Sequence, residues 1–144
     1  MATLKIDGME GLDAALGRIQ DIPPEVKTSA LSRMADIAAA AIRRSGESMG
    51  VRDPNSGVHI LDKITKAQPT VTASGGHQDI TFAGSRRRGR TSTRNAAIAF
   101  VNEYGKRGQP ARPFIGRAMN ENADQIASAG GAELGDWLEK DFVK

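Results

Sequence analysis

The segment 95–119, which reads NAAIAFVNEYGKRGQPARPFIGRAM, constrains the fold of this chain more than any other stretch. Its apolar residues recur at three- and four-residue steps, the spacing of one face of a short helix: Ala97, Phe100, Val101 and Tyr104. Gly105 follows the last of them, and we predict that the helix ends there, because a left-handed cap costs least for glycine. A strand is the alternative, since Ile98, Phe100 and Asn102 share the parity of one strand face.

Two prolines stiffen the chain after this segment. Pro110 and Pro113 restrict their own φ and push the residue before each of them toward extended geometry. Phe114 therefore follows a stiff corner, and we expect it to anchor in the core. The Arg112 guanidinium can form a fixed fork with a carboxylate. Glu103 is the only acid between residues 84 and 119, so it is the expected partner of Arg112.

Seven residues make up the structural motif of this stretch: Glu103, Tyr104, Gly105, Pro110, Arg112, Pro113 and Phe114. With an apolar segment before them and Ile115 and Ala118 after them, they resemble the signature of a phage family. That family is the gene-product-ten-like neck and tail-component proteins of lambdoid (HK-type) siphophages. The chain departs from the family pattern in the basic loop after Gly105, where Thr or Ser often follows the glycine, and in an arginine-rich insertion at 85–94.

The resemblance implies a structural virion protein of a tailed phage or prophage. Such a protein would assemble as an oligomeric ring at the head–tail junction, in neck or tail completion, beside connector or tail proteins. It would be made in the host cytoplasm and end in the virion. The family also has a long N-terminal helix, a central β-hairpin and a C-terminal helix, in the order expected for this chain.

We expect an α+β fold, in which a small antiparallel β-sheet (a hairpin plus short strands) packs against a long N-terminal helix and a C-terminal helix. A short strand at Leu4 and Ile6 and a helix over 9–19 would come first. A long helix over 24–49 follows, because prolines suit its first turn and apolar residues recur along one face. That face comprises Val26, Ala30, Leu31, Met34, Ile37, Ala38, Ala41 and Ile42.

Two β-like runs, 64–73 and 78–83, flank a predicted hairpin loop at 74–77, and Pro69 weakens the first run. The last helix should start near Phe114. We expect a break or kink at Gly130 and Gly131, because each glycine costs a helix about 1 kcal/mol relative to alanine. The expected inward residues of this helix are Met119, Ile126, Leu134, Trp137 and Leu138.

Composition supports one domain over 1–144, since 144 residues suffice for a single modest core. With one Trp, one Tyr and four Phe, that core must rely on aliphatic residues and alanine, and such a thin core favours further burial between subunits. The absence of Cys excludes a disulfide framework and a thiolate zinc site. We find no signal peptide and no 18-residue apolar stretch, so we expect no contact with a membrane.

Charge is distributed unevenly along the chain. Residues 86–112 contain seven Arg and one Lys against the single Glu103, whereas residues 113–144 contain three bases and six acids. The segment 85–94 shows no periodicity, so we predict a mobile basic loop there. Its arginines could neutralise DNA phosphates, dock on an acidic neighbour such as the C-terminal helix of the next subunit, or remain solvated. These arginines are Arg86, Arg87, Arg88, Arg90 and Arg94.

Residues suited to catalysis are scarce. His59 and His77 are the only histidines; both lie in or beside turn sequence, without a second ligand at helical spacing, and we expect them to be exposed. The chain has no phosphate-binding glycine loop. We therefore expect no enzyme activity, no cofactor and no metal. A structural virion protein is the leading hypothesis, and a small basic nucleic-acid-binding module is the alternative.

Overall fold

The computed structural model describes residues 21–51, 59–73 and 75–142, so the expected strand at Leu4 and Ile6 and the expected helix over 9–19 lie outside the described residues. The described part has an α+β fold: helices flank small antiparallel two-stranded sheets, as predicted. No helix within those residues combines the length and the apolar character needed to cross a membrane.

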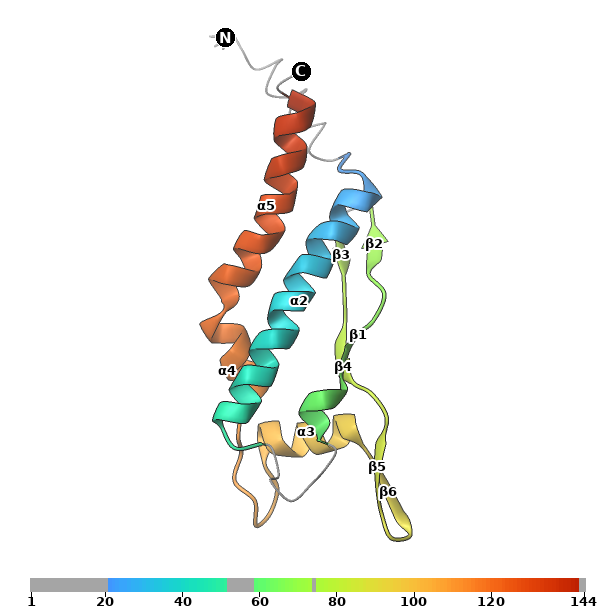
Figure 1. Ribbon diagram of the computed structural model, residues 1–144, viewed down its shortest axis with the longest axis vertical. Coiled ribbons are helices and arrows are strands. Elements are labelled where there is room, and N and C mark those ends of the chain that lie inside the picture. Colours follow the sequence, from blue (N-terminus) through green and yellow to red (C-terminus); the bar gives the residue numbers. More distant parts are fainter. Residues whose placement is uncertain (1–20, 52–58, 74, 143–144) are drawn as a thin grey trace, which may run out of the picture.

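Helix α2 (Pro24–Ser48) forms the central column of the molecule (Figure 1) and confirms the predicted long helix. Proline occupies its first turn, where the missing N–H breaks no hydrogen bond. Its buried stripe is made largely of small residues, which lets other backbones come close: Ala30, Ala35, Ala38, Ala41, Ile42 and Gly46. Two polar contacts hold α2 against the C-terminal helix. Glu133 of that helix pairs with Arg33, and it accepts a hydrogen bond from Ser29 Oγ at 2.9 Å.

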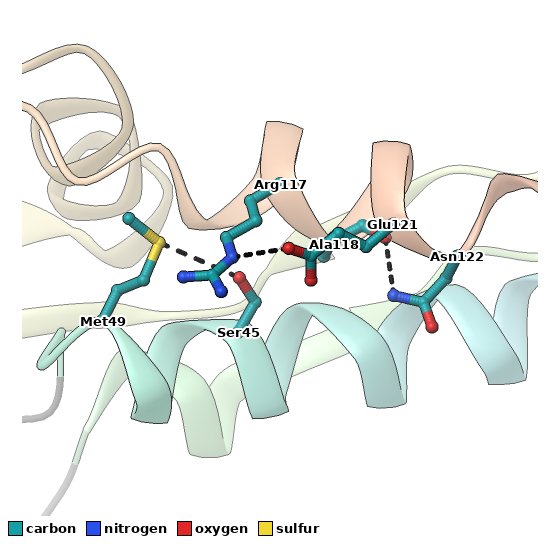
Figure 2. Close-up of polar contacts among 6 residues, drawn as sticks. All are labelled: Ser45, Met49, Arg117, Ala118, Glu121 and Asn122. Carbon is teal, nitrogen blue, oxygen red and sulfur yellow. Dashed lines mark hydrogen bonds and ion pairs between the residues drawn. The ribbon is translucent and has the colours of Figure 1, made fainter.

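Helices α4 (Phe114–Glu121) and α5 (Ala123–Phe142) run along one side of α2 (Figure 1). The predicted break at Gly130 and Gly131 is wrong, because the helix is interrupted at Asn122 instead. The Asn122 side chain donates from Nδ2 to the Ala118 carbonyl at 2.8 Å, and its backbone N–H donates to the same oxygen at 3.2 Å (Figure 2). Asn122 is the residue that follows α4, and its φ of −115° and ψ of 11° depart from helical values.

Gly130 stays helical for a packing reason. A Cβ at this position would lie 2.5 Å from Met34 Sδ, so the glycine allows α5 to approach α2 closely. Of the predicted inward residues, Ile126 is buried, whereas Met119 is 40% exposed and that prediction is wrong. Leu134, Trp137 and Leu138 are half-buried.

A narrow β-ribbon runs along the other side of α2 (Figure 1). After the 3-10 helix η1 (Ile60–Lys63), strand β1 (Ile64–Lys66) pairs with β4 (Ile80–Phe82), and β2 (Thr70–Thr72) pairs with β3 (Gly75–His77), both antiparallel. The ribbon is interrupted at 67–69, which includes Pro69, the residue expected to weaken the first β-like run. Residues 75–77 were expected in a loop but form β3. A Cβ on Gly76 would lie 3.0 Å from Leu31 Cδ1, so this glycine lets the ribbon pack on α2.

The predicted irregular loop at 85–94 is also wrong, because these residues form a regular hairpin. Strand β5 (Ser85–Arg88) pairs antiparallel with β6 (Thr91–Arg94), which leads directly into helix α3 (Asn95–Tyr104). Gly89 and Arg90 form the two-residue turn of this hairpin. Gly89 has a positive φ of 58° and Arg90 does not, as in the hairpin turn type that places glycine first.

The core lies where α2, η1, β4, α3 and α4 meet, and its buried residues are Ala41, Ile42, Val51, Ile60, Leu61, Phe82, Ala99, Phe114 and Ala118. Phe114 and Leu61 are the largest fully buried side chains of the described residues. His59 was expected to be exposed but is only 4% exposed, and its Nδ1 accepts a hydrogen bond from the Leu61 N–H at 3.2 Å. It therefore caps η1.

Substitution by alanine at two helical glycines should change the free energy of unfolding in opposite directions. At Gly46 a Cβ would lie 2.6 Å from Leu61 Cδ2 and 3.2 Å from Phe114 Cδ2, both in fully buried side chains. We expect Gly46→Ala to lower the free energy of unfolding by about 1–2 kcal/mol through overpacking. A Cβ at Gly131 would have no atom within 4 Å. Gly131→Ala should therefore raise the free energy of unfolding by about 0.5–1 kcal/mol, because alanine costs less conformational entropy in a helix. Urea unfolding measures both, and equal stabilisation by the two substitutions would contradict this packing.

Candidate functional site

Helix α3 ends at the glycine that the sequence predicted, so the helical alternative for this segment is confirmed. Gly105 has a φ of 77°, and its N–H donates to the Val101 carbonyl at 2.8 Å. A Cβ there would lie 2.8 Å from the Ala111 nitrogen. Glycine is therefore required by both conformation and space.

The chain then makes a tight turn that brings residue 109 back beside residue 106. Lys106 and Gln109 exchange two backbone hydrogen bonds, at 3.0 and 2.9 Å, with Arg107 and Gly108 at the tip. Pro110 and Pro113 follow. Pro113 has φ −74° and ψ 64°, the geometry of an inverse γ-turn, and the Phe114 N–H donates across it to the Arg112 carbonyl at 2.7 Å.

Arg112 and Glu103 do not form the predicted pair. Arg112 donates from Nη1 to the Gly50 carbonyl at 2.8 Å, and its backbone N–H donates to the Asn102 carbonyl at 2.6 Å. The end of α2 leaves carbonyls that need donors, which is why a cation finds a partner there. Arg112 therefore ties the corner to α2 and α3.

Glu103 instead caps helix α4. Its Oε2 accepts from the Ile115 N–H at 2.8 Å, and its Oε1 accepts from the Gly116 N–H at 2.9 Å. A helix N-terminus carries unpaired N–H groups and partial positive charge, and Pro113, the residue before α4, offers no side-chain cap. Two features of the sequence could have indicated this contact: a proline where a capping side chain usually stands, and a single acid nearby.

These contacts join three helices into one closed corner. The predicted anchor is confirmed, because Phe114 is 0% exposed and packs edge-on against Phe82 with ring centroids 6.1 Å apart. Glu103 links α3 to α4, and Arg112 links the corner to α2. Backbone hydrogen bonds within the turn and from Arg112 to the Asn102 carbonyl hold the corner in place.

The apolar face that the sequence marks on α3 is not its buried face. Phe100 is 62% exposed and Tyr104 is 69% exposed, and their rings contact each other with centroids 4.7 Å apart. The buried face is Asn95, Ala99 and Asn102. Both asparagines have backbone partners, since Asn95 Nδ2 donates to the Ala83 carbonyl at 2.7 Å and Asn102 Nδ2 to the Ile98 carbonyl at 2.9 Å. Apolar periodicity cannot detect a face buried through such bonds.

A groove of about 360 Å³ lies between the β5–β6 hairpin and the exposed side of α3. The register pairs Arg86 with Thr93 and Arg88 with Thr91, so these four side chains share one face of the hairpin. They line the groove together with Ala97, Ile98, Val101 and Asn102 of α3, and with Lys106 and Gln109 of the turn.

The five candidate arginines are thus divided between two surfaces. Arg86 and Arg88 line the groove. Arg87, Arg90 and Arg94 are exposed elsewhere on the hairpin, and Arg87 Nε donates to the Gly89 carbonyl at 3.2 Å. A single patch of five equivalent charges is not formed.

Nothing in the described residues gathers three or more His, Asp or Glu side chains that could hold a metal ion. Comparisons with protein-family models, with curated proteins and with solved structures find no match to this chain. The resemblance to the phage family therefore rests on the motif residues alone.

The Glu103 cap predicts a stability effect well above that of an ordinary surface acid. Glu103→Ala should lower the free energy of unfolding by about 1–2 kcal/mol, since it leaves two N–H groups of α4 unpaired. Glu103→Gln, which keeps one strong acceptor, should cost less.

Glu121→Ala provides the control, because Glu121 makes only an exposed pair with Arg117 at 2.8 Å and should cost less than about 0.5 kcal/mol. Thermal and urea unfolding measure all three variants. Equal losses for Glu103→Ala and Glu121→Ala would contradict the capping role.

Proposed function

We propose that this protein is a non-enzymatic structural subunit of a tailed phage or prophage. It assembles into an oligomeric ring at the head–tail junction and serves in neck or tail completion. The observation that carries the proposal is the exposed aromatic face of α3, held beside a basic groove by a rigid corner. An assembly subunit needs such a fixed surface, whereas an enzyme needs convergent reactive groups.

The corner supports this function through its chemistry. The side chains of Glu103 and Arg112 form hydrogen bonds that hold the helices together. The prolines and Gly105 restrict the backbone between them. Apart from Tyr104, which is exposed beside Phe100, the motif residues on which the family resemblance rests therefore act as scaffold residues here. A scaffold that orients one helix suits a protein whose task is geometric.

The thin core supports assembly as well. Six of the thirteen buried apolar residues of the described part are alanine, while Phe100 and Tyr104 are exposed. Aromatic residues are enriched at the centres of protein interfaces and are seldom left exposed together without a partner. Association would bury this pair and add the apolar contact that the core lacks.

A nucleic-acid-binding module is the competing function, and one observation favours it. The β5–β6 hairpin projects from the body of the molecule as a two-stranded ribbon (Figure 1), a shape that the major groove of DNA admits. Five arginines on this ribbon could neutralise phosphates. The exposed aromatic pair is not needed for phosphate contacts, and we therefore rank assembly first.

The two functions differ in how the protein behaves near physiological salt, about 0.15 M. For a ring subunit we expect sedimentation velocity to show self-association that rises with protein concentration, and negligible affinity for duplex DNA. A DNA-binding module would remain monomeric and bind duplex with a log–log salt slope on the order of −4, for about five neutralised phosphates.

Alanine at Arg86, Arg87, Arg88, Arg90 and Arg94 would abolish that DNA binding. The control is alanine at Arg43 and Arg44, two exposed arginines on α2. It removes positive charge from a surface away from the hairpin. A monomer that binds duplex tightly at physiological salt, and loses this binding only with the hairpin substitutions, would reverse the ranking.

A further inference from the structure

We propose that the groove between the β5–β6 hairpin and α3 receives the acidic C-terminal half of α5 from a second copy of this chain. The inference rests on the proposed assembly function and names its contact. Copies would therefore associate head to tail, with a basic end of one against an acidic end of the next.

The groove has the chemistry of a peptide or helix acceptor. Its floor on α3 is largely apolar, with Ala97, Ile98 and Val101 beside Asn102, and its walls carry Arg86, Arg88 and Lys106. The exposed rings of Phe100 and Tyr104 extend the apolar surface along the same helix. An apolar floor with basic walls favours an occupant that presents apolar side chains flanked by carboxylates.

The C-terminal half of α5 presents this complement. Asp136, Glu139 and Asp141 are exposed, and Leu134 and Leu138 are half-buried on the same helix. Glu133, by contrast, is already engaged by Arg33 and Ser29 of α2, so it belongs to the fold rather than to a new contact.

The two surfaces lie too far apart to meet within one molecule. The β5–β6 hairpin and the C-terminal end of α5 lie at opposite ends of the long axis (Figure 1). A contact between these two surfaces therefore joins two copies. Such a contact joins two different surfaces, so it is heterologous, and repeated copies close into a ring when the rotation between neighbours permits it.

Charge reversal on each surface tests the contact. The groove variant combines Arg88→Glu and Lys106→Glu, and the α5 variant combines Asp136→Arg and Glu139→Arg; all four side chains are exposed. Each variant alone then has like charges on both surfaces. We expect its self-association, measured by sedimentation velocity, to weaken at least about tenfold, which is 1.4 kcal/mol of association free energy.

An equimolar mixture of the two variants should recover assembly close to that of the wild type. The acidic groove of one variant now matches the basic α5 of the other, and the remaining two surfaces keep their native charges. Arg43→Glu with Arg44→Glu on α2 changes the net charge as much as the groove variant does, so it is the matched control for that variant, and it should assemble like the wild type. Unfolding curves confirm that each variant keeps its fold.

Several outcomes would overturn the inference. If the wild type assembles and both variants do so equally alone, the contact lies elsewhere, and the assembly function stands without it. If the mixture fails to recover what the groove variant lost, α5 is not the occupant. If the groove variant loses only duplex DNA binding, the groove is a nucleic-acid site. A wild type that stays monomeric up to about 1 mM overturns both the inference and the proposed self-assembly.

Discussion

The carboxylate of Glu103 on the first N–H groups of α4 is the contact through which α3 is oriented. Without it, α4 would begin with unpaired donors behind a proline, and the direct polar link between the α3 and α4 helices would be lost. Arg112 adds the link to the end of α2, and Phe114 places its ring in the core between these elements. Because β6 runs directly into α3, the same contact also sets the direction of the β5–β6 hairpin.

This arrangement separates the residues that hold the fold from those that meet a partner. Asn95, Asn102 and Glu103 bury their polar groups against backbone atoms, so the inner face of α3 is satisfied by hydrogen bonds. The outer face is left to Phe100 and Tyr104. A helix that buries its polar side and exposes its aromatic side is costly in an isolated monomer, and an assembly that covers the aromatic side removes that cost.

Local signals in the sequence predicted the long helix α2, the end of α3 at Gly105, the weakening of the first β-like run by Pro69 and the Phe114 anchor. Each of these depends on one residue's own geometry or on a long apolar repeat. The misses involve partners distant in the chain. The face of α3 depends on Asn95 finding the Ala83 carbonyl, and Arg112 prefers the end of α2 to Glu103. The hairpin at 85–94 has polar strands with no hydrophobic alternation. Gly89, which forms its turn, was the one residue in the segment whose type is typical of a hairpin.

Hydrogen exchange at several protein concentrations tests the central claim, a rigid corner that presents an assembly surface. In dilute protein, the backbone N–H groups of Arg112, Phe114, Ile115 and Gly116 should exchange as slowly as those of α2. At concentrations where copies associate, new protection should appear in β5–β6, in α3 and in the last turns of α5, while the corner stays unchanged. Corner amides that exchange as fast as an exposed loop in the monomer would contradict the account, as would association that protects none of these three surfaces.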